Sequence, residues 1–279
     1  MTNPYKIAGP ALISFSGGRT SAYMLHEIVR AYDGQLPTDV HVCFANTGKE
    51  REETLRFVHE CGSRWSVRIR WLEWRTPAQG GFEEVGFNSA GRIGEPFTAM
   101  LAYEKSNYLP SAVQRSCTQH LKVACLDRFA RSLGWSHWAN VIGLRYDEGH
   151  RIFKMLARND AGTEKSISIA PLSKAKVSKP DVIAFWARQP FDLALRSYEG
   201  NCDLCFLKGA KKILTMIREN PGIERWWVDM EATAGRRFNK DYSYADLARQ
   251  ARDQGHLFDG FMEDEHDAEC GLHCTAEAA

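Results

Sequence analysis

The sequence lacks any run of about 18 apolar residues, which a membrane-spanning helix would require. Its first residues lack the apolar core of a secretory signal peptide, so we expect a cytoplasmic protein with no membrane partner. An excess of one charge is also missing. The 36 Lys and Arg residues oppose 35 Asp and Glu residues, which excludes a strong overall field that would recruit nucleic acid. Any anion binding must therefore be local.

Two common nucleotide-binding motifs are absent near the start of the chain. No Gly-Lys-Ser/Thr follows the first Gly-rich turn, which excludes a Walker A loop, and the third glycine of a dinucleotide-binding fingerprint is missing. What is present is a short apolar run at residues 12–15, then Ser16-Gly17-Gly18, then a helical pattern over residues 20–32. Such a turn directs backbone N–H groups and the positive end of the helix dipole at an anion, usually a phosphate. The predicted phosphate-binding residues are Ser14, Ser16, Gly17, Gly18, Arg19, Thr20 and Ser21.

The order of apolar runs and helical patterns predicts an α/β fold with a mainly parallel sheet sandwiched by helices. Strands are predicted at residues 12–15, 41–45, 67–72 and 138–144, and helices at 20–32, 50–61, 100–108, 118–133 and 182–188. Residues 76–96 are predicted to form a long loop, and a hairpin-like polar stretch is predicted after Arg145. From Gly200 the pattern indicates a helical appendage. We therefore divide the chain into residues 1–199, a nucleotide-binding domain, and residues 200–279, the appendage.

Two further groups follow predicted strands and so fall at the ligand-binding edge of a parallel sheet. Asn46-Thr47-Gly48 follows the second strand, where a plain strand-ending turn is the alternative to a nucleotide contact. Gly143, Arg145 and Arg151 follow the fourth. Two arginines there suit bidentate contacts with phosphate or sulfate oxygens, and Glu148 would order them through a charge pair. A solvated hairpin with ion pairs is the alternative.

The eight cysteines of a cytoplasmic chain indicate thiols or metal ligands rather than disulfides. Arg115, Cys117 and Lys122 combine a thiol with two cations at the start of a predicted helix, which favours a thiolate or binds a phosphate. Cys202 and Cys205 have the spacing at which two thiolates hold one metal ion or cluster. Buried thiols or a redox dithiol are the alternatives. The other cysteines before the tail, Cys43, Cys61 and Cys125, fall inside apolar patterns and are predicted to lie in the core.

The motifs, in this order, resemble those of the phosphoadenosine-phosphosulfate (PAPS) reductase family. Ser16-Gly17-Gly18-Arg19-Thr20-Ser21 resembles the PP-loop of the adenine-nucleotide alpha-hydrolase superfamily, which also contains ATP pyrophosphatases and tRNA-thiolating enzymes. Asn46-Thr47-Gly48 resembles the family's second nucleotide motif, with Asn in place of the usual Asp. Residues 143–151 resemble its Gly-x-Arg-x-x-Glu-x-x-Arg element. The tail sequence Glu269-Cys270-Gly-Leu-His273 matches the signature that carries the nucleophilic cysteine.

The resemblance implies thiol-dependent reduction of an adenylylated sulfate to sulfite, with thioredoxin or glutaredoxin as the reductant. The implied catalytic residues are Cys270, His273, Arg145 and Arg151. The implied nucleotide contacts add Asn46, Thr47, Gly48, Arg115, Lys122 and Gly143 to the phosphate-binding loop. Cys117, Cys202 and Cys205 would hold a [4Fe-4S] cluster or Zn²⁺, although Ser116 replaces one of the family's cysteines. The fourth ligand and the role of Cys274 stay open, and a tail that only binds metal is the alternative to a nucleophile.

Two other functions are compatible with the same motifs. An ATP-dependent adenylylating or sulfur-transfer enzyme would use the intact Ser-Gly-Gly-x-x-Ser loop on ATP and act on nucleic acid or a small molecule. A nucleotide-binding accessory protein with a structural metal would catalyse no reaction. The choice among PAPS, its form without the 3′-phosphate, and ATP is open, and so is a homo-oligomeric state.

Overall fold

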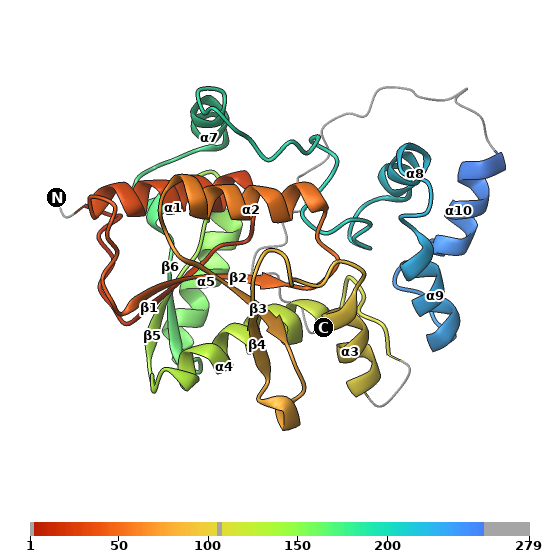
Figure 1. The fold of residues 1–279 in the computed structure, drawn as a ribbon, viewed down its shortest axis with the longest axis horizontal. Helices are drawn as coiled ribbons and strands as arrows, with labels where there is room; N and C mark the ends of the chain where they lie inside the picture. Colours follow the sequence, from red (N-terminus) through yellow and green to blue (C-terminus); the bar gives the residue numbers. More distant parts are fainter. Residues whose placement is uncertain (1–2, 105–107, 254–279) are drawn as a thin grey trace.

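The computed structural model describes residues 3–104 and 108–253, which are built around one six-stranded sheet (Figure 1). The strand order is β4-β3-β2-β1-β5-β6, and every neighbouring pair is parallel except β3 with β4. This arrangement confirms the predicted fold class. The strands are β1 (Ala11–Ser14), β2 (Val40–Asn46), β3 (Ile69–Trp74), β4 (Phe82–Val85), β5 (Trp138–Val141) and β6 (Ser166–Ile169).

The strand order reverses at β1. The chain runs from β1 outward through β2 and β3, then returns to pair β5 on the other side of β1, where Ala11 lies opposite both Val40 and Ala139. In open α/β sheets, ligands bind beyond the carboxyl ends of the strands at such a reversal. The Gly-rich turn that follows β1 therefore lies at the expected position for a ligand.

Helices cover both faces of the sheet, as Figure 1 shows for α1, α2 and α7 on one face and α3 and α4 on the other. Side chains of β1 alternate between two cores. Ile13 packs with α1 and α2, and Leu12 packs with α3 and α4. The helices of these layers are α1 (Arg19–Ala31), α2 (Glu52–Arg64), α3 (Glu95–Tyr103), a π-helix (Thr118–Ala124), α4 (Cys125–Ser132), α5 (Gly149–Ala161), α6 (Pro171–Lys174) and α7 (Lys179–Trp186).

The predicted helical appendage consists of α8 (Ala210–Glu219), α9 (Arg225–Ala234) and α10 (Tyr244–Asp253), at the right of Figure 1. It shares a core with the sheet, since Trp227 and Tyr244 belong to the same apolar cluster as Leu72 and Phe97. A buried ion pair, Lys49 Nζ to Asp203 Oδ2 at 2.7 Å, joins the two parts. The division at residue 199 stays a prediction.

Three sequence expectations differ from the structure. The predicted loop over residues 76–96 contains a 3₁₀-helix (Pro77–Gln79) and the edge strand β4. The hairpin-like stretch predicted after Arg145 is helix α5. The helix predicted over residues 118–133 begins as a π-helix.

Within residues 3–104 and 108–253, no helix is both long enough and apolar enough to cross a membrane.

Candidate functional site

The turn between β1 and α1 has the geometry of an anion site. Gly17 adopts a φ of +78°, and a Cβ there would lie 2.7 Å from Cγ2 of Thr54, so the position requires glycine. Gly18 is the N-cap of α1 and supplies no side-chain acceptor. The N-cap therefore gives no side-chain acceptor to the first N–H groups of α1, which point to where an anion would bind.

The loop hydroxyls hold the turn in shape. The Oγ atoms of Ser16 and Ser21 lie 2.9 Å apart, and Ser21 Oγ also donates to the carbonyl of Gly18 at 2.9 Å. Ser14 Oγ donates to Oδ1 of Asn140 at 2.6 Å and so links β1 to β5. These bonds hold the loop in the conformation seen here.

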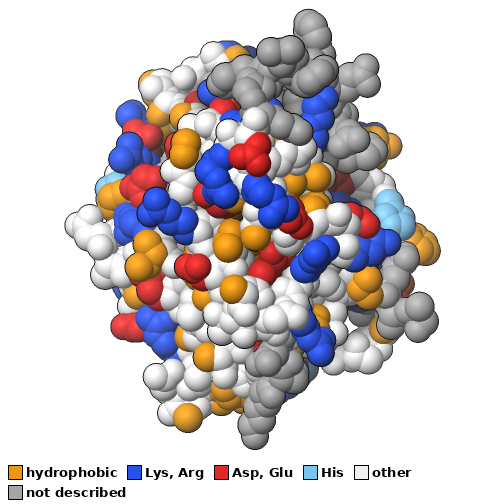
Figure 2. All heavy atoms as spheres, turned by 90° about the vertical axis from the view of Figure 1, so that its right-hand side faces the viewer, with side chains coloured by type: hydrophobic (Ala, Val, Ile, Leu, Met, Phe, Trp, Pro, Cys, Tyr) orange, Lys and Arg blue, Asp and Glu red, His pale blue; other side chains and the backbone are white. Residues whose placement is uncertain are grey.

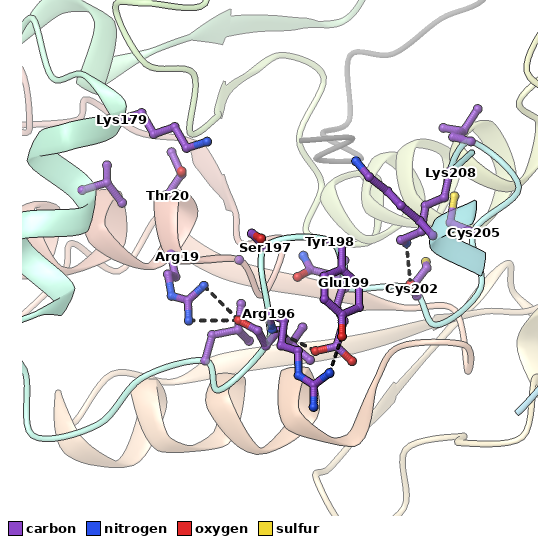
Figure 3. A pocket seen from close by; sticks show the side chains of 18 of the residues that line it. Arg19, Thr20, Lys179, Arg196, Ser197, Tyr198, Glu199, Cys202, Cys205 and Lys208 are labelled. Atoms are coloured by element: carbon purple, nitrogen blue, oxygen red, sulfur yellow. Dashed lines mark hydrogen bonds between the residues drawn. The ribbon is translucent and has the colours of Figure 1, made fainter. Parts of the chain in front are cut away.

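The side chain of Arg19 points away from the turn (Figure 3) and forms a fork with Asp192, with Nε to Oδ1 at 2.7 Å and Nη2 to Oδ2 at 2.6 Å. Burial alone would raise the pKa of Asp192, but the hydrogen bonds and charge of Arg19 outweigh it and lower that pKa. In this conformation Arg19 anchors the segment after α7, and its predicted phosphate contact stays a prediction.

Arg145 reaches the same turn from the end of β5. Its Nη1 donates to Oγ1 of Thr20 at 3.1 Å. Glu148 accepts the backbone N–H of Arg145 at 2.8 Å and also pairs with Arg151, so the predicted ordering of both arginines by Glu148 is confirmed. A Cβ on Gly143 would lie 3.2 Å from Cα of Ser21, which shows how closely this segment approaches α1.

Asn46 is fully buried at the end of β2, and its side chain holds the turn that follows this strand. Its amide donates to Oε1 of Glu73 at 2.7 Å and to the carbonyl of Gly91 at 2.9 Å, while its Oδ1 accepts the N–H of Gly48 at 3.2 Å. Gly48 has a φ of +78°, and a Cβ there would lie 2.8 Å from Cδ of Pro96. In this structure Asn46 therefore fastens the turn to the segment before α3.

The segment that contains Cys202 and Cys205 packs against the turn after β2. Glu50 and Cys202 form an isolated antiparallel bridge, and the N–H of Arg51 donates to the carbonyl of Asn201 at 2.8 Å. Nδ2 of Asn201 donates to the carbonyl of Ser16 at 2.8 Å. This segment, from a point more than 150 residues farther along the chain, therefore contacts the Gly-rich turn after β1.

Glu50 is the buried acid beneath that segment. Its carboxylate accepts Thr47 N–H at 2.8 Å and Thr47 Oγ1 at 2.9 Å, and Cys202 Sγ lies 3.9 Å from its Oε1. Burial raises the pKa of Glu50, opposed by the charge of Lys122 and by the bonds from Thr47. Lys122, on the π-helix, thus acts electrostatically on the carboxylate that contacts Cys202.

These elements enclose a cavity of about 310 Å³, within the range of small-molecule sites (Figure 3). Its walls combine three predicted motifs: Gly18, Arg19 and Thr20 from the turn, Arg145, and the pair Cys202 and Cys205. It also contains polar residues that the sequence did not single out, namely Lys179, Arg196, Tyr198, Glu199, Lys208 and Lys212. One cavity thus brings the Gly-rich turn, several cations and two thiols together.

Residues 10–192 match the phosphoadenosine phosphosulfate reductase domain. The chain belongs to this family. The match covers the sheet, the PP-loop and the Arg145 element, and it makes the chain a PP-loop protein of a sulfur-handling enzyme family.

Among curated proteins, the chain is 30% identical to an uncharacterized nin region protein of Escherichia phage lambda over 226 residues, 77% of this chain and 71% of that one. An uncharacterized protein of Methanocaldococcus jannaschii is 25% identical over 168 residues, which is 60% of this chain and 29% of that protein.

Two solved structures are similar at lower levels. The PAPS reductase from Candida auris, a phosphate complex, has 14% identity and a TM-score of 0.40, covering 67% of this chain and 79% of that one. The U34-tRNA thiolase from Methanococcus maripaludis with its [4Fe-4S] cluster has 10% identity and a TM-score of 0.33, covering 96% and 80%. The assignment to the PAPS reductase family rests on the domain match.

Not every predicted site residue of this family is brought together. Arg115 lines a separate cavity of about 690 Å³ that also contains Asn140 of β5. Within residues 3–104 and 108–253, no three His, Cys, Asp or Glu side chains are grouped closely enough to hold a metal ion. Cys117 therefore does not complete a three-cysteine site with Cys202 and Cys205 in this arrangement, and a cluster stays a prediction.

The remaining cysteines fall into two sets. Cys43, Cys61 and Cys125 are buried, and burial raises the pKa of all three thiols, for Cys125 to about 12, so the prediction that they are core residues is confirmed. Cys270 and Cys274, together with His273, lie outside the described residues, and their predicted roles stay predictions.

Proposed function

We propose that this protein is a sulfonucleotide reductase that reduces an adenylylated sulfate to sulfite with thiols. The observation that carries the proposal is the single cavity that joins the N-terminus of α1, Arg145 and the thiols of Cys202 and Cys205. A substrate with a nucleotide phosphate at one end and an oxidised sulfur at the other matches those two ends.

At the nucleotide end, the residues that would bind the phosphate already face the cavity. The N–H groups at the start of α1 would bind the phosphate, and the Thr20 hydroxyl is already oriented by Arg145. Arg145, held by Glu148, would neutralise charge on the phosphate that becomes the leaving group.

At the sulfur end, the reaction takes two thiols. The thiolate of Cys270, the nucleophile implied by the family resemblance, attacks sulfur, the S–O bond to the phosphate breaks, and the nucleotide leaves with that electron pair. A second thiol, after losing its proton, attacks the cysteine sulfur of the resulting S-sulfocysteine. Sulfite departs and a disulfide forms, so sulfur gains the two electrons that the thiols lose. A thioredoxin-like dithiol then reduces the disulfide.

The test is sulfite release under anaerobic conditions from PAPS and from the form without the 3′-phosphate, each with thioredoxin. We expect sulfite from one of them, abolition of release in Cys270→Ser, and a reduced rate in Arg145→Gln. The matched control is Arg158→Gln, which changes an arginine in a different cavity. No sulfite from either compound would refute the proposal.

A second candidate is an ATP-dependent adenylylating enzyme, favoured by one observation. The Ser-Gly-Gly-x-x-Ser loop is intact, and its two serines hold it ready for a pyrophosphate. For this activity a small acceptor fits better than nucleic acid on the face shown in Figure 2, where Lys and Arg are mixed with Asp and Glu. Pyrophosphate release from ATP, without sulfite release from either sulfonucleotide, would select this function.

A further inference from the structure

The cavity has a second helix N-terminus in its wall besides that of α1. Gly209 is the N-cap of α8, supplies no side-chain acceptor, and lines the cavity together with Lys212 of the first turn. That turn carries Lys211 and Lys212 and no acidic residue. An anion at the positive end of the helix dipole is favourable, and the positive charges of the two lysines add to that attraction.

Lys208, two residues before α8, is an independent sign of an anionic ligand. It lines the cavity, yet only 7% of it is exposed. Its Nζ donates to the carbonyl of Cys202 at 3.2 Å (dashed in Figure 3), and no carboxylate of the described residues pairs with it. An ammonium group has three donors, and burying its charge without a counter-ion is costly. A ligand anion in the cavity would remove that cost.

The backbone near Lys208 leaves room for this ammonium. A Cβ on Gly200 would lie 3.1 Å from Nζ of Lys208, so a larger residue there would press on the charge. The next residue, Asn201, donates to the carbonyl of Ser16 in the PP-loop. Residues 200 and 201 therefore connect the surroundings of Lys208 directly to the phosphate-binding turn.

We propose that Lys208, Lys212 and the N-terminus of α8 form a second anion subsite, which holds the sulfate group of the adenylylated sulfate while the PP-loop holds its nucleotide phosphate. The identity of this anion rests on the proposed function. The subsite distinguishes the sulfonucleotide from the nucleotide that remains after sulfur transfer, because only the former carries an anion at that end. It also places the sulfur atom beside Cys202 and Cys205.

The experiment measures binding by calorimetry in the Cys270→Ser background, where no turnover occurs, with AMP and adenylyl sulfate as probes. We expect the parent to bind adenylyl sulfate more tightly than AMP. Lys208→Met should weaken adenylyl sulfate binding about 10- to 100-fold and leave AMP binding unchanged, as expected for loss of a charged hydrogen bond. The matched control Lys211→Met alters an exposed lysine outside the cavity and should change neither affinity.

A merely structural role for Lys208 gives a different result. Lys208→Met would then lower the unfolding temperature of the free protein, whereas removal of an unpaired buried charge leaves it unchanged or raises it. Gly200→Ala keeps the lysine and should weaken adenylyl sulfate binding to a smaller degree. An unchanged preference for adenylyl sulfate in Lys208→Met would overturn the subsite.

Failure of the proposed function is recognised separately, with inorganic sulfate as the probe in the presence of AMP. If the wild type releases no sulfite but sulfate still stabilises it against heat, and Lys208→Met loses that stabilisation, the subsite stands and the reductase does not. If sulfate stabilises both proteins equally, the subsite is refuted.

Discussion

The ion pair between Lys49 and Asp203 offers the sharpest test of how the appendage is attached to the sheet domain. The side chains are 6% and 9% exposed, with Nζ 2.7 Å from Oδ2. Oδ1 of Asp203 accepts Nε1 of Trp227 at 2.9 Å, and the ammonium lies 5.0 Å from the ring centre of Trp226. We therefore predict that Asp203→Asn, which keeps the shape and an acceptor for Trp227, destabilises the protein by leaving the Lys49 charge buried and unpaired.

The magnitude follows from the burial of both partners. Removing one charge of a buried pair costs about 3–5 kcal/mol, whereas removing both together costs much less. Asp203→Asn should thus lower the urea midpoint by roughly 1 M or more at an m-value near 3 kcal/mol/M. Adding Lys49→Met to Asp203→Asn should restore part of that loss. The assay is urea unfolding of the two single variants and the double variant, followed by tryptophan fluorescence.

The double-mutant cycle measures the coupling energy between Lys49 and Asp203. Residues in contact show coupling of about 0.5–3 kcal/mol, and here we expect the upper half of that range. Additive effects of the two substitutions, within about 0.5 kcal/mol, would refute the reasoning, because each charge would then be satisfied without the other. A small effect of Asp203→Asn alone would do the same.

Three further predictions concern separate parts of the chain. Gly17→Ala puts a methyl group at a φ of +78° and 2.7 Å from Thr54 Cγ2, so we expect a loss of about 2–4 kcal/mol in unfolding free energy and weaker AMP binding by calorimetry; unaltered AMP affinity would contradict a phosphate site there. Asp192→Asn removes the partner of Arg19. Because the folded pKa of Asp192 lies below its unfolded value of about 3.9, the wild-type advantage, at most about 1 kcal/mol, is complete at pH 7 and is lost as the pH falls through the folded pKa. Urea midpoints that differ equally at pH 7 and pH 2.5 would argue against this pair. Ser243→Ala removes an Oγ that accepts a backbone N–H in the first turn of α10 at 3.0 Å, and should cost about 1 kcal/mol in thermal unfolding, with no loss indicating that the cap is not used.

The sequence was sufficient for the central sheet and the PP-loop because both depend on local patterns. The buried run that became β1 is continuous and apolar, and Gly17-Gly18 follows it directly. Strand β4 was missed because it is a short edge strand, Phe82-Glu-Glu-Val85, whose pairing with β3 comes from the tertiary fold. Helix α5 was predicted as a polar hairpin although Ile152, Met155 and Leu156 recur at helical spacing, and only Met155 among its residues is buried.

The candidate site was only partly predictable for the same reason. Arg145 was identified because it follows a strand, and Cys202 and Cys205 because of their spacing. The contact between Asn201 and Ser16 joins residues 185 positions apart, and no local pattern encodes it. Lys208 looks like any surface lysine in the sequence. Its burial depends on packing in the folded protein, which no local pattern reveals.

The isolated bridge between Glu50 and Cys202 has a consequence for how this enzyme family can diversify. The family match ends at residue 192, but the cavity continues through Lys212. One wall therefore comes from the shared domain and the other from a segment that is held to it by backbone hydrogen bonds, by the side chain of Asn201 and by the Lys49–Asp203 ion pair. Under the proposed function, exchange of residues 196–212 between relatives, with Asn201 and Asp203 kept, should change which substrates are accepted at the sulfur end without altering the nucleotide-binding residues within residues 10–192. Libraries aimed at new acceptors should be built in that segment.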